Sequence, residues 1–194
     1  MQKIILLIVV ALLWSFSLIL FKNTKMNFFK FLAGSVGIFT ISMIFFLPYL
    51  EGNLNFLISN TLNIIGRSTN YFQVFKENSI VSVDTREGIV SIFINYECSG
   101  VIEMLVFTSL SLFFPFGGRG RKILLTIGGN VFIFFANIAR VLFIIFVTKT
   151  FGASAFYLAH TLLARILFFV LMIILYYFVF TATHLRYQNV GDIK

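Results

Sequence analysis

Three side chains whose chemistry could combine in one reaction lie far apart along the chain. Cys98 is the only cysteine, Arg140 lies inside a long apolar run, and His160 is one of two histidines. A thiol becomes a strong nucleophile when a neighbouring base or cation favours the thiolate. An imidazole can take the thiol proton and return it to a leaving amine, and a guanidinium can stabilise the oxyanion. Together these residue types predict acyl transfer through a thioester.

The composition is that of a membrane protein. Of the 194 residues, 59% are hydrophobic and only 11% are charged, whereas about a quarter of a soluble domain is charged. This excludes a cytosolic enzyme, a nucleic-acid module and a disordered chain, so no nucleic-acid partner is expected despite the net charge of +8. One cysteine and two histidines cannot build a familiar zinc site or an internal disulfide, and we expect no metal or cofactor.

The elements that must position the three side chains are long apolar runs. Each is close to the length of about 20 residues that crosses a bilayer as a helix. No cleavage pattern follows the first run, so we expect it to stay in the mature protein. The sequence therefore predicts an all-α polytopic membrane protein with about five transmembrane helices, at residues 4–21, 31–50, 101–116, 123–147 and 157–180.

Residues 51–97 are the only long polar stretch. Apolar residues at near-helical spacing from Leu54 to Phe75 predict an interfacial amphipathic helix. The β-branched segments 80–84 and 88–94, joined by a turn, predict a small β-hairpin, acting either as a lid or as a strand edge that pairs with an extended substrate. The predicted regions are two helices in 1–50, this extracytoplasmic part in 51–97, three helices in 98–181, and a cytoplasmic tail in 182–194.

The loop charges predict an orientation in the plasma membrane of a bacterium. The positive-inside rule assigns the side richer in lysine and arginine to the cytoplasm. One side would hold Lys22, Lys25, Lys30, Arg119, Arg121, Lys122, Arg186 and Lys194, and the other only Lys3, Arg67, Lys76, Arg86 and Lys149. The N-terminus is then outside, the C-terminus is cytoplasmic, and the 51–97 segment and the active site face outward.

The depth of the three chemical side chains is nearly the same. Cys98, Arg140 and His160 lie 18, 18 and 21 residues from the cytoplasmic ends of their respective helices. At about 1.5 Å per residue this is about 27 to 32 Å, one hydrocarbon thickness. Three different helices are therefore expected to bring a thiol, a guanidinium and an imidazole to the same outer level.

These residues resemble the three signature motifs of the exosortase and archaeosortase family. The matching segments are Tyr96-Glu97-Cys98-Ser99-Gly100, then Asn137-Ile138-Ala139-Arg140, and then His160. The resemblance covers about residues 95–175. It implies a membrane-embedded cysteine transpeptidase in which Cys98 is the nucleophile, Arg140 stabilises the transition state and His160 is the acid or base. Asn137 would support the site, and Glu97, Ser99 and Gly100 would support it or contact the substrate.

The resemblance also implies the partners. Substrates of the family carry a C-terminal sorting signal made of a short motif, a transmembrane helix and a basic cluster. The enzyme cleaves this signal at the outer face of the lipid bilayer, and transfers the protein to water or to a surface acceptor such as an envelope lipid or glycan. The chain lacks the additional helices of longer members and resembles the compact type of Gram-positive bacteria.

Two other functions fit the same residues. In a small transporter or channel subunit, Arg140, His160, Arg165 and Glu103 would line a proton or anion path. In a noncatalytic envelope scaffold, Cys98, Arg140 and His160 could each be replaced by alanine without loss of function. Glu103 and Arg165 are expected either to form a structural ion pair or to help position a substrate. Replacement of Cys98 by serine distinguishes the enzyme from the transporter. The enzyme would lose its activity, whereas most transport mechanisms would tolerate the change.

Overall fold

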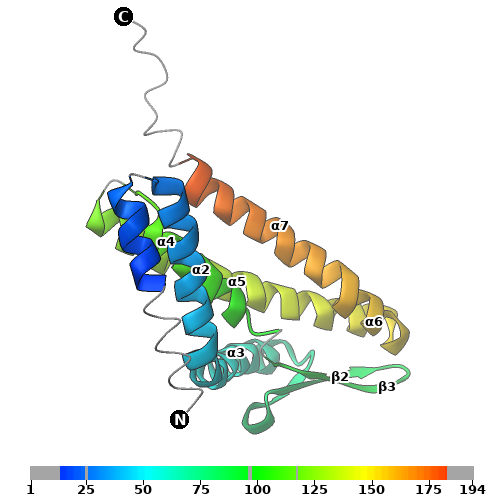
Figure 1. Cartoon of the computed structure of the whole chain (residues 1–194). Helices are drawn as coiled ribbons and strands as arrows, with labels where there is room; N and C mark the ends of the chain where they lie inside the picture. Colours follow the sequence, from blue (N-terminus) through cyan, green and yellow to red (C-terminus); the bar gives the residue numbers. More distant parts are fainter. Residues whose placement is uncertain (1–13, 25, 96–97, 117, 183–194) are drawn as a thin grey trace, which may run out of the picture.

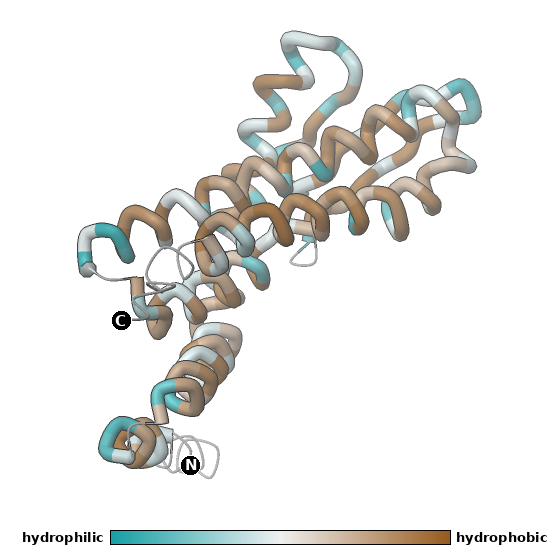
Figure 2. Tube along the Cα trace, turned by 90° about the horizontal axis from the view of Figure 1, so that it is seen from above, coloured by the Kyte–Doolittle hydropathy of each residue, from teal (hydrophilic) through white to brown (hydrophobic). Residues whose placement is uncertain are grey.

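A computed structural model describes residues 14–24, 26–95, 98–116 and 118–182, and shows a mostly helical membrane protein with a small antiparallel sheet. Three helical segments are long and apolar enough to cross a membrane: α2 (Asn27–Phe45), α5 (Arg119–Phe151) and a C-terminal helix (Ala153–Thr181). The C-terminal helix contains α6 (Phe156–Leu158), a π-helical segment (Ala159–Leu163), α7 (Ala164–Tyr176) and a second π-helical segment (Tyr177–Thr181). Figure 2 colours the backbone by hydropathy and shows these helices as mostly hydrophobic, with hydrophilic residues mainly toward helix ends and loops.

The other two predicted runs do not form helices of that length among the described residues. Residues 14–23 are helical, but most of the first run lies outside the described residues. The third run forms α4 (Val101–Phe113), which has 13 residues. It ends early because Phe114 precedes Pro115, and the proline ring disfavours the helical conformation in the preceding residue. Phe114 accordingly adopts an extended backbone with ψ 137°.

The second run was predicted to continue to residue 50, which is wrong. The backbone changes direction at Phe46, and Leu47–Thr69 forms a separate helix, α3, with Pro48 in its first turn (Figure 1). Proline is common at this position because the N–H groups of the first turn have no intrahelical acceptor. The N–H that proline lacks would therefore make no helix hydrogen bond there. The buried residues of α3 recur on one face, as an amphipathic helix requires: Asn55, Ile58, Ser59, Leu62 and Gly66.

The predicted hairpin is present and belongs to a larger sheet. Strands β2 (Ile80–Thr85) and β3 (Gly88–Phe93) pair antiparallel, with Thr85 opposite Gly88. A third strand, β1 (Gln73–Phe75), pairs with β2 and gives the order β1-β2-β3. The near-helical spacing of Phe72 and Phe75 predicted that the amphipathic helix extends to residue 75, which is wrong. Helix α3 ends at Thr69, and Asn70 adopts the left-handed conformation with φ 54° that leads into the sheet.

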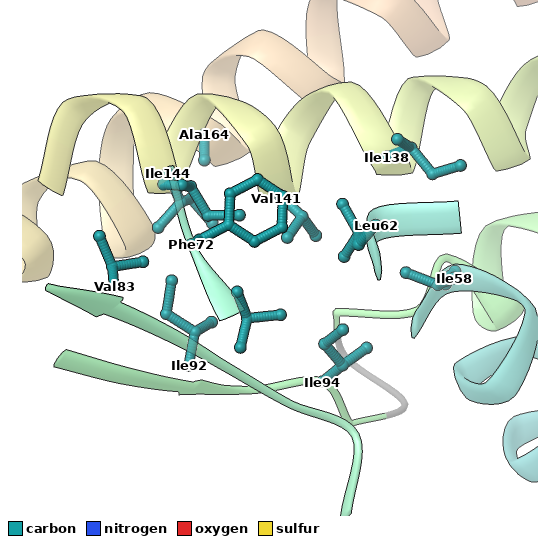
Figure 3. Close-up of a cluster of buried hydrophobic side chains, with 12 residues drawn as sticks. Ile58, Leu62, Phe72, Val83, Ile92, Ile94, Ile138, Val141, Ile144 and Ala164 are labelled. Atoms are coloured by element: carbon teal, nitrogen blue, oxygen red, sulfur yellow. The ribbon is translucent and has the colours of Figure 1, made fainter. Parts of the chain in front are cut away.

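Two hydrophobic clusters attach these elements to α5. The inner face of the sheet packs with α3 against the C-terminal half of α5 (Figure 3). The second cluster joins α4, α5 and the C-terminal helix. Its buried members are Phe107, Phe116, Ile133, Ala136, Phe168, Leu175 and Val179. Because α5 contributes to both clusters, it sets the position of the sheet relative to the flanking membrane helices.

The hairpin tip also contacts the end of α5. Lys149 Nζ donates a hydrogen bond of 2.8 Å to the carbonyl of Asp84, and the backbone N–H of Ser154 donates one of 3.3 Å to Glu87 Oε2. These two contacts hold the turn of the hairpin against the loop that begins the C-terminal helix. The hairpin is therefore attached at its tip as well as through its buried face.

Candidate active site

Cys98 lies in a short, well-bonded loop directly before α4. Its backbone N–H donates to both the carbonyl and the side-chain oxygen of Asn95, at 3.0 and 3.2 Å. Gly100 adopts the left-handed conformation with φ 74°, which glycine reaches without a Cβ penalty, and α4 begins at the next residue. Ser99 Oγ accepts a hydrogen bond of 3.4 Å from the N–H of Val101. The thiol side chain is 7% exposed.

His160 reaches Cys98 from the π-helical segment Ala159–Leu163. Cys98 Sγ and His160 Nε2 are 3.5 Å apart, within hydrogen-bond distance for sulfur. The imidazole ring packs on Phe156, with ring centroids 5.5 Å apart. A π-helical turn widens the helix locally and is frequent at functional sites. The apolar periodicity of the run predicted only a continuous helix, and no sequence signal marked this turn.

Asn137 connects α5 to the cysteine loop. Its Nδ2 donates a hydrogen bond of 2.7 Å to the carbonyl of Cys98, and the side chain is fully buried. A Cβ built on Gly100 would lie 3.4 Å from Cβ and Cγ of Asn137. That is an ordinary van der Waals distance, so it is the left-handed backbone conformation, and not lack of space, that favours glycine here. The structure thus gives the motif asparagine a direct contact with the backbone of the cysteine.

Arg140 lies one turn further along α5 on a similar face. Its side chain is 5% exposed, and its Cζ lies 5.6 Å from the centroid of the Phe168 ring, a cation–π distance. The guanidinium also lines a cavity of about 740 Å³ between α4 and the C-terminal helix. Thr161, the residue after His160, lines the same cavity. Arg140 is therefore a buried residue that lines this cavity three residues after Asn137 on α5.

The remaining predicted residues have separate positions. Glu103 and Arg165 both line the cavity, but no ion pair joins them in the described part of the chain, so the expected structural pair is not formed. Glu97 lies outside the described residues. Within those residues, no group of three or more His, Cys, Asp and Glu side chains could hold a metal ion.

The fold and the site define an integral membrane protein that brings together a cysteine from the loop before α4 and a histidine from the C-terminal helix. A family model described as transmembrane exosortase (EpsH) matches residues 2–177. The chain therefore belongs to the exosortase family of membrane sortase-like enzymes. This confirms the resemblance found in the motifs and extends it over nearly the whole chain. No curated protein and no solved structure matches the sequence.

Proposed function

We propose that the chain is an intramembrane cysteine protease and transpeptidase that cleaves the C-terminal sorting signal of exported proteins. Membership of the exosortase family implies sorting-signal substrates. The observation that carries the proposed mechanism is the 3.5 Å contact between Cys98 Sγ and His160 Nε2. A thiol and an imidazole at this separation can exchange a proton directly, which is the geometry that activates a cysteine nucleophile.

In the acylation step, His160 takes the thiol proton and Cys98 Sγ attacks the carbonyl carbon of the scissile peptide bond. The new C–S bond places negative charge on the carbonyl oxygen, and the guanidinium of Arg140 stabilises that oxyanion. When the tetrahedral intermediate collapses, the C–N bond breaks and His160 returns the proton to the leaving amine. The products are a thioester on Cys98 and a released C-terminal segment.

In the second step, a nucleophile resolves the thioester. Water gives hydrolysis, whereas an amine or hydroxyl of an envelope lipid or glycan gives transfer to a surface acceptor. His160 removes the proton of the attacking group and returns it to the sulfur as the C–S bond breaks. The free thiol is then restored, and no cofactor is consumed.

The supporting residues hold the nucleophile in place. Asn137 fixes the carbonyl of Cys98, Ser99 accepts from the first turn of α4, and Gly100 supplies the left-handed conformation that leads into α4. We propose that Glu97 also belongs to this supporting set. Because the loop is held on both sides of Cys98, little reorganisation would be needed before attack.

The membrane arrangement that fits this function has five crossings with the N-terminus outside. The charge count of the loops supports that orientation. The short α4 supports a site beneath the surface, since 13 residues span only about 20 Å. Cys98 at its start then lies inside the outer leaflet, where the sorting signal of a membrane-inserted substrate would meet it.

The sheet offers a way to hold that signal. The order β1-β2-β3 leaves the outer edge of β3 without a neighbouring strand among the described residues. The chain leaves β3 at Phe93 and reaches Cys98 five residues later. We propose that an extended substrate segment pairs with this edge, because main-chain hydrogen bonding would lead its carbonyls toward the thiol.

Trapping the intermediate tests the proposal. Wild-type protein in its own membranes should yield a protein joined to Cys98 through a hydroxylamine-sensitive thioester, identified by mass spectrometry. His160→Gln should lower the yield strongly, and Cys98→Ser should abolish the hydroxylamine-sensitive adduct. A transporter or scaffold would form no adduct and would tolerate Cys98→Ser, which would overturn the assignment.

A further inference from the structure

A cavity beside the proposed active site opens sideways toward lipid. It lies between α4 and the C-terminal helix and has a volume of about 740 Å³. Three of its lining residues, Leu162, Ile166 and Phe169, are 50%, 52% and 64% exposed. In a membrane-spanning helix such side chains face acyl chains, so a molecule can enter the cavity from the bilayer.

The polar lining of this cavity carries excess positive charge. Arg140 and Arg165 contribute two guanidinium groups, whereas Glu103 is the only carboxylate among its lining residues. Thr161 adds a hydroxyl. Guanidinium groups bind phosphate with paired, charge-assisted hydrogen bonds, and such bonds strengthen where water is scarce. This end of the cavity therefore suits a phosphate that carries a net negative charge.

An apolar groove continues from the charged end along α7. This second hollow has a volume of about 350 Å³, shares Ile102, Glu103, Phe169 and Met172 with the cavity, and adds Val106, Ile173 and Tyr176. From Arg165 to Tyr176 the helix advances 11 residues, or about 16 Å. That is half of a hydrocarbon core about 30 Å thick. The cavity and the groove together therefore extend over about the length of one leaflet.

We propose that the cavity and groove form a binding site for one anionic phospholipid, with the phosphate at Arg165 and Arg140 and an acyl chain along Val106 and Ile173. A helical peptide is too thick to be the occupant. A helix about 10 Å in diameter would fill the 350 Å³ of the groove with only about 5 Å of its length. An acyl chain is far thinner, and the apolar lining from Phe169 to Tyr176 suits it. The proposal does not depend on thioester chemistry, although Arg140 takes part in both.

Lipid retention tests the site. The wild type and variants are reconstituted in nanodiscs of equal phosphatidylglycerol and phosphatidylcholine, released gently, and the retained lipid is counted by native mass spectrometry. The wild type should retain phosphatidylglycerol preferentially. Arg165→Gln should lower that preference about tenfold, because it removes a charge-assisted phosphate contact, and Glu103→Gln should raise it. Arg67→Gln, in α3 and outside this cavity, should leave it unchanged.

The apolar groove is tested separately. Val106→Trp should fill the groove and lower retention of phosphatidylglycerol, whereas Val131→Trp, at an exposed position of α5 outside both hollows, should not. Soluble glycerol 3-phosphate should not displace the lipid, which distinguishes a lipid site from a free-phosphate site. Equal retention of the two lipids by the wild type, or no effect of Arg165→Gln, would overturn the proposal and leave the cavity to a peptide substrate.

Discussion

Asn137 of α5 donates its side-chain amide to the carbonyl of Cys98 at 2.7 Å, and so connects the central membrane helix to the backbone of the cysteine. Both groups are buried, so neither can turn to water for a replacement. The hydrogen bond fixes the loop from the α5 side, while the imidazole of His160 approaches the sulfur from the C-terminal helix. The position of the thiol thus depends on two separate helices.

Replacement of Asn137 should therefore affect both stability and reactivity. Asn137→Ala leaves the buried carbonyl of Cys98 without its donor, which costs about 1–3 kcal/mol, and frees the loop that holds the thiol. Thermal unfolding and the yield of the Cys98 thioester should both fall. The control is Asn130→Ala, elsewhere on α5, which removes hydrogen bonds to the Thr108 hydroxyl of α4 and to the Thr126 carbonyl. It should lower stability but preserve the thioester. Equal thioester yields in both variants would show that Asn137 only stabilises the fold.

A methyl group at Gly100 should disturb the same loop. The residue has φ 74°, a conformation that costs other L-residues about 1–2 kcal/mol. The added Cβ would lie at an ordinary van der Waals distance of 3.4 Å from Asn137, so the cost comes from the backbone conformation. Gly100→Ala should therefore lower the unfolding temperature and slow thioester formation. Gly128→Ala is the matched control, because that position is helical with no atom within 4 Å of a built Cβ. Gly128→Ala should be neutral or stabilising. If it lowered the unfolding temperature and the thioester rate as much as Gly100→Ala, the backbone conformation of Gly100 would not explain the effect.

Removing the imidazole tests its role as acid and base. His160→Gln keeps a polar side chain of similar reach but cannot shuttle the proton, and general acid–base catalysis contributes typically 10²–10⁴-fold. Single-turnover formation of the Cys98 thioester should slow by about that factor while membrane insertion stays unchanged. His184→Gln, which alters the other histidine of the chain, should react at the wild-type rate. If His160→Gln also does so, the 3.5 Å contact has no catalytic meaning.

The sequence predicted well what depends on regular periodicity. Alternating β-branched residues gave the β2–β3 hairpin, and the buried face of α3 follows its helical spacing. The errors lie where tertiary contacts override local pattern. Phe72 and Phe75 match helical spacing, but pairing with β2 places Phe75 in β1, while Phe72 packs in the core beneath the sheet. Likewise, no residue in the C-terminal run signals the π-helical turn that carries His160.

The candidate site was predictable in part for a simple geometric reason. Rise per residue placed Cys98 and His160 at one depth, and the structure brings them to 3.5 Å. Depth alone says nothing about rotation around the helix axis. It could not indicate that Asn137 faces the cysteine loop while Arg165 faces the neighbouring cavity without pairing with Glu103. Those outcomes depend on how α4 and the C-terminal helix pack on α5.

The edge of β3 allows a test of substrate pairing. In a two-residue hairpin the closing pair, here Thr85 and Gly88, is hydrogen-bonded, and hydrogen-bonded and non-hydrogen-bonded pairs then alternate along the strands. Ser91 and its partner Ser82 form a non-hydrogen-bonded pair, so the N–H of Ser91 points toward the free edge of β3. Ser91→Pro removes this outward donor without removing a ladder hydrogen bond. Processing of sorting-signal proteins in cells should decrease, while Ser91→Ala, which retains the N–H, should remain active. Normal processing by the proline variant would exclude pairing at this position.

The contribution of Arg140 to the rate of thioester formation should depend on the shape of its side chain as well as on its charge. Its guanidinium is buried beside Phe168 and presents a planar fork of donors, whereas lysine offers a compact ammonium. Loss of one oxyanion donor typically costs about 10²–10³ in rate. Arg140→Lys should therefore slow thioester formation by about that factor even though the charge is kept. Arg165→Lys, at the more exposed arginine of the same cavity, should retain most of the rate. A fully active Arg140→Lys would show that only the positive charge matters, and that the oxyanion is not held by the guanidinium fork.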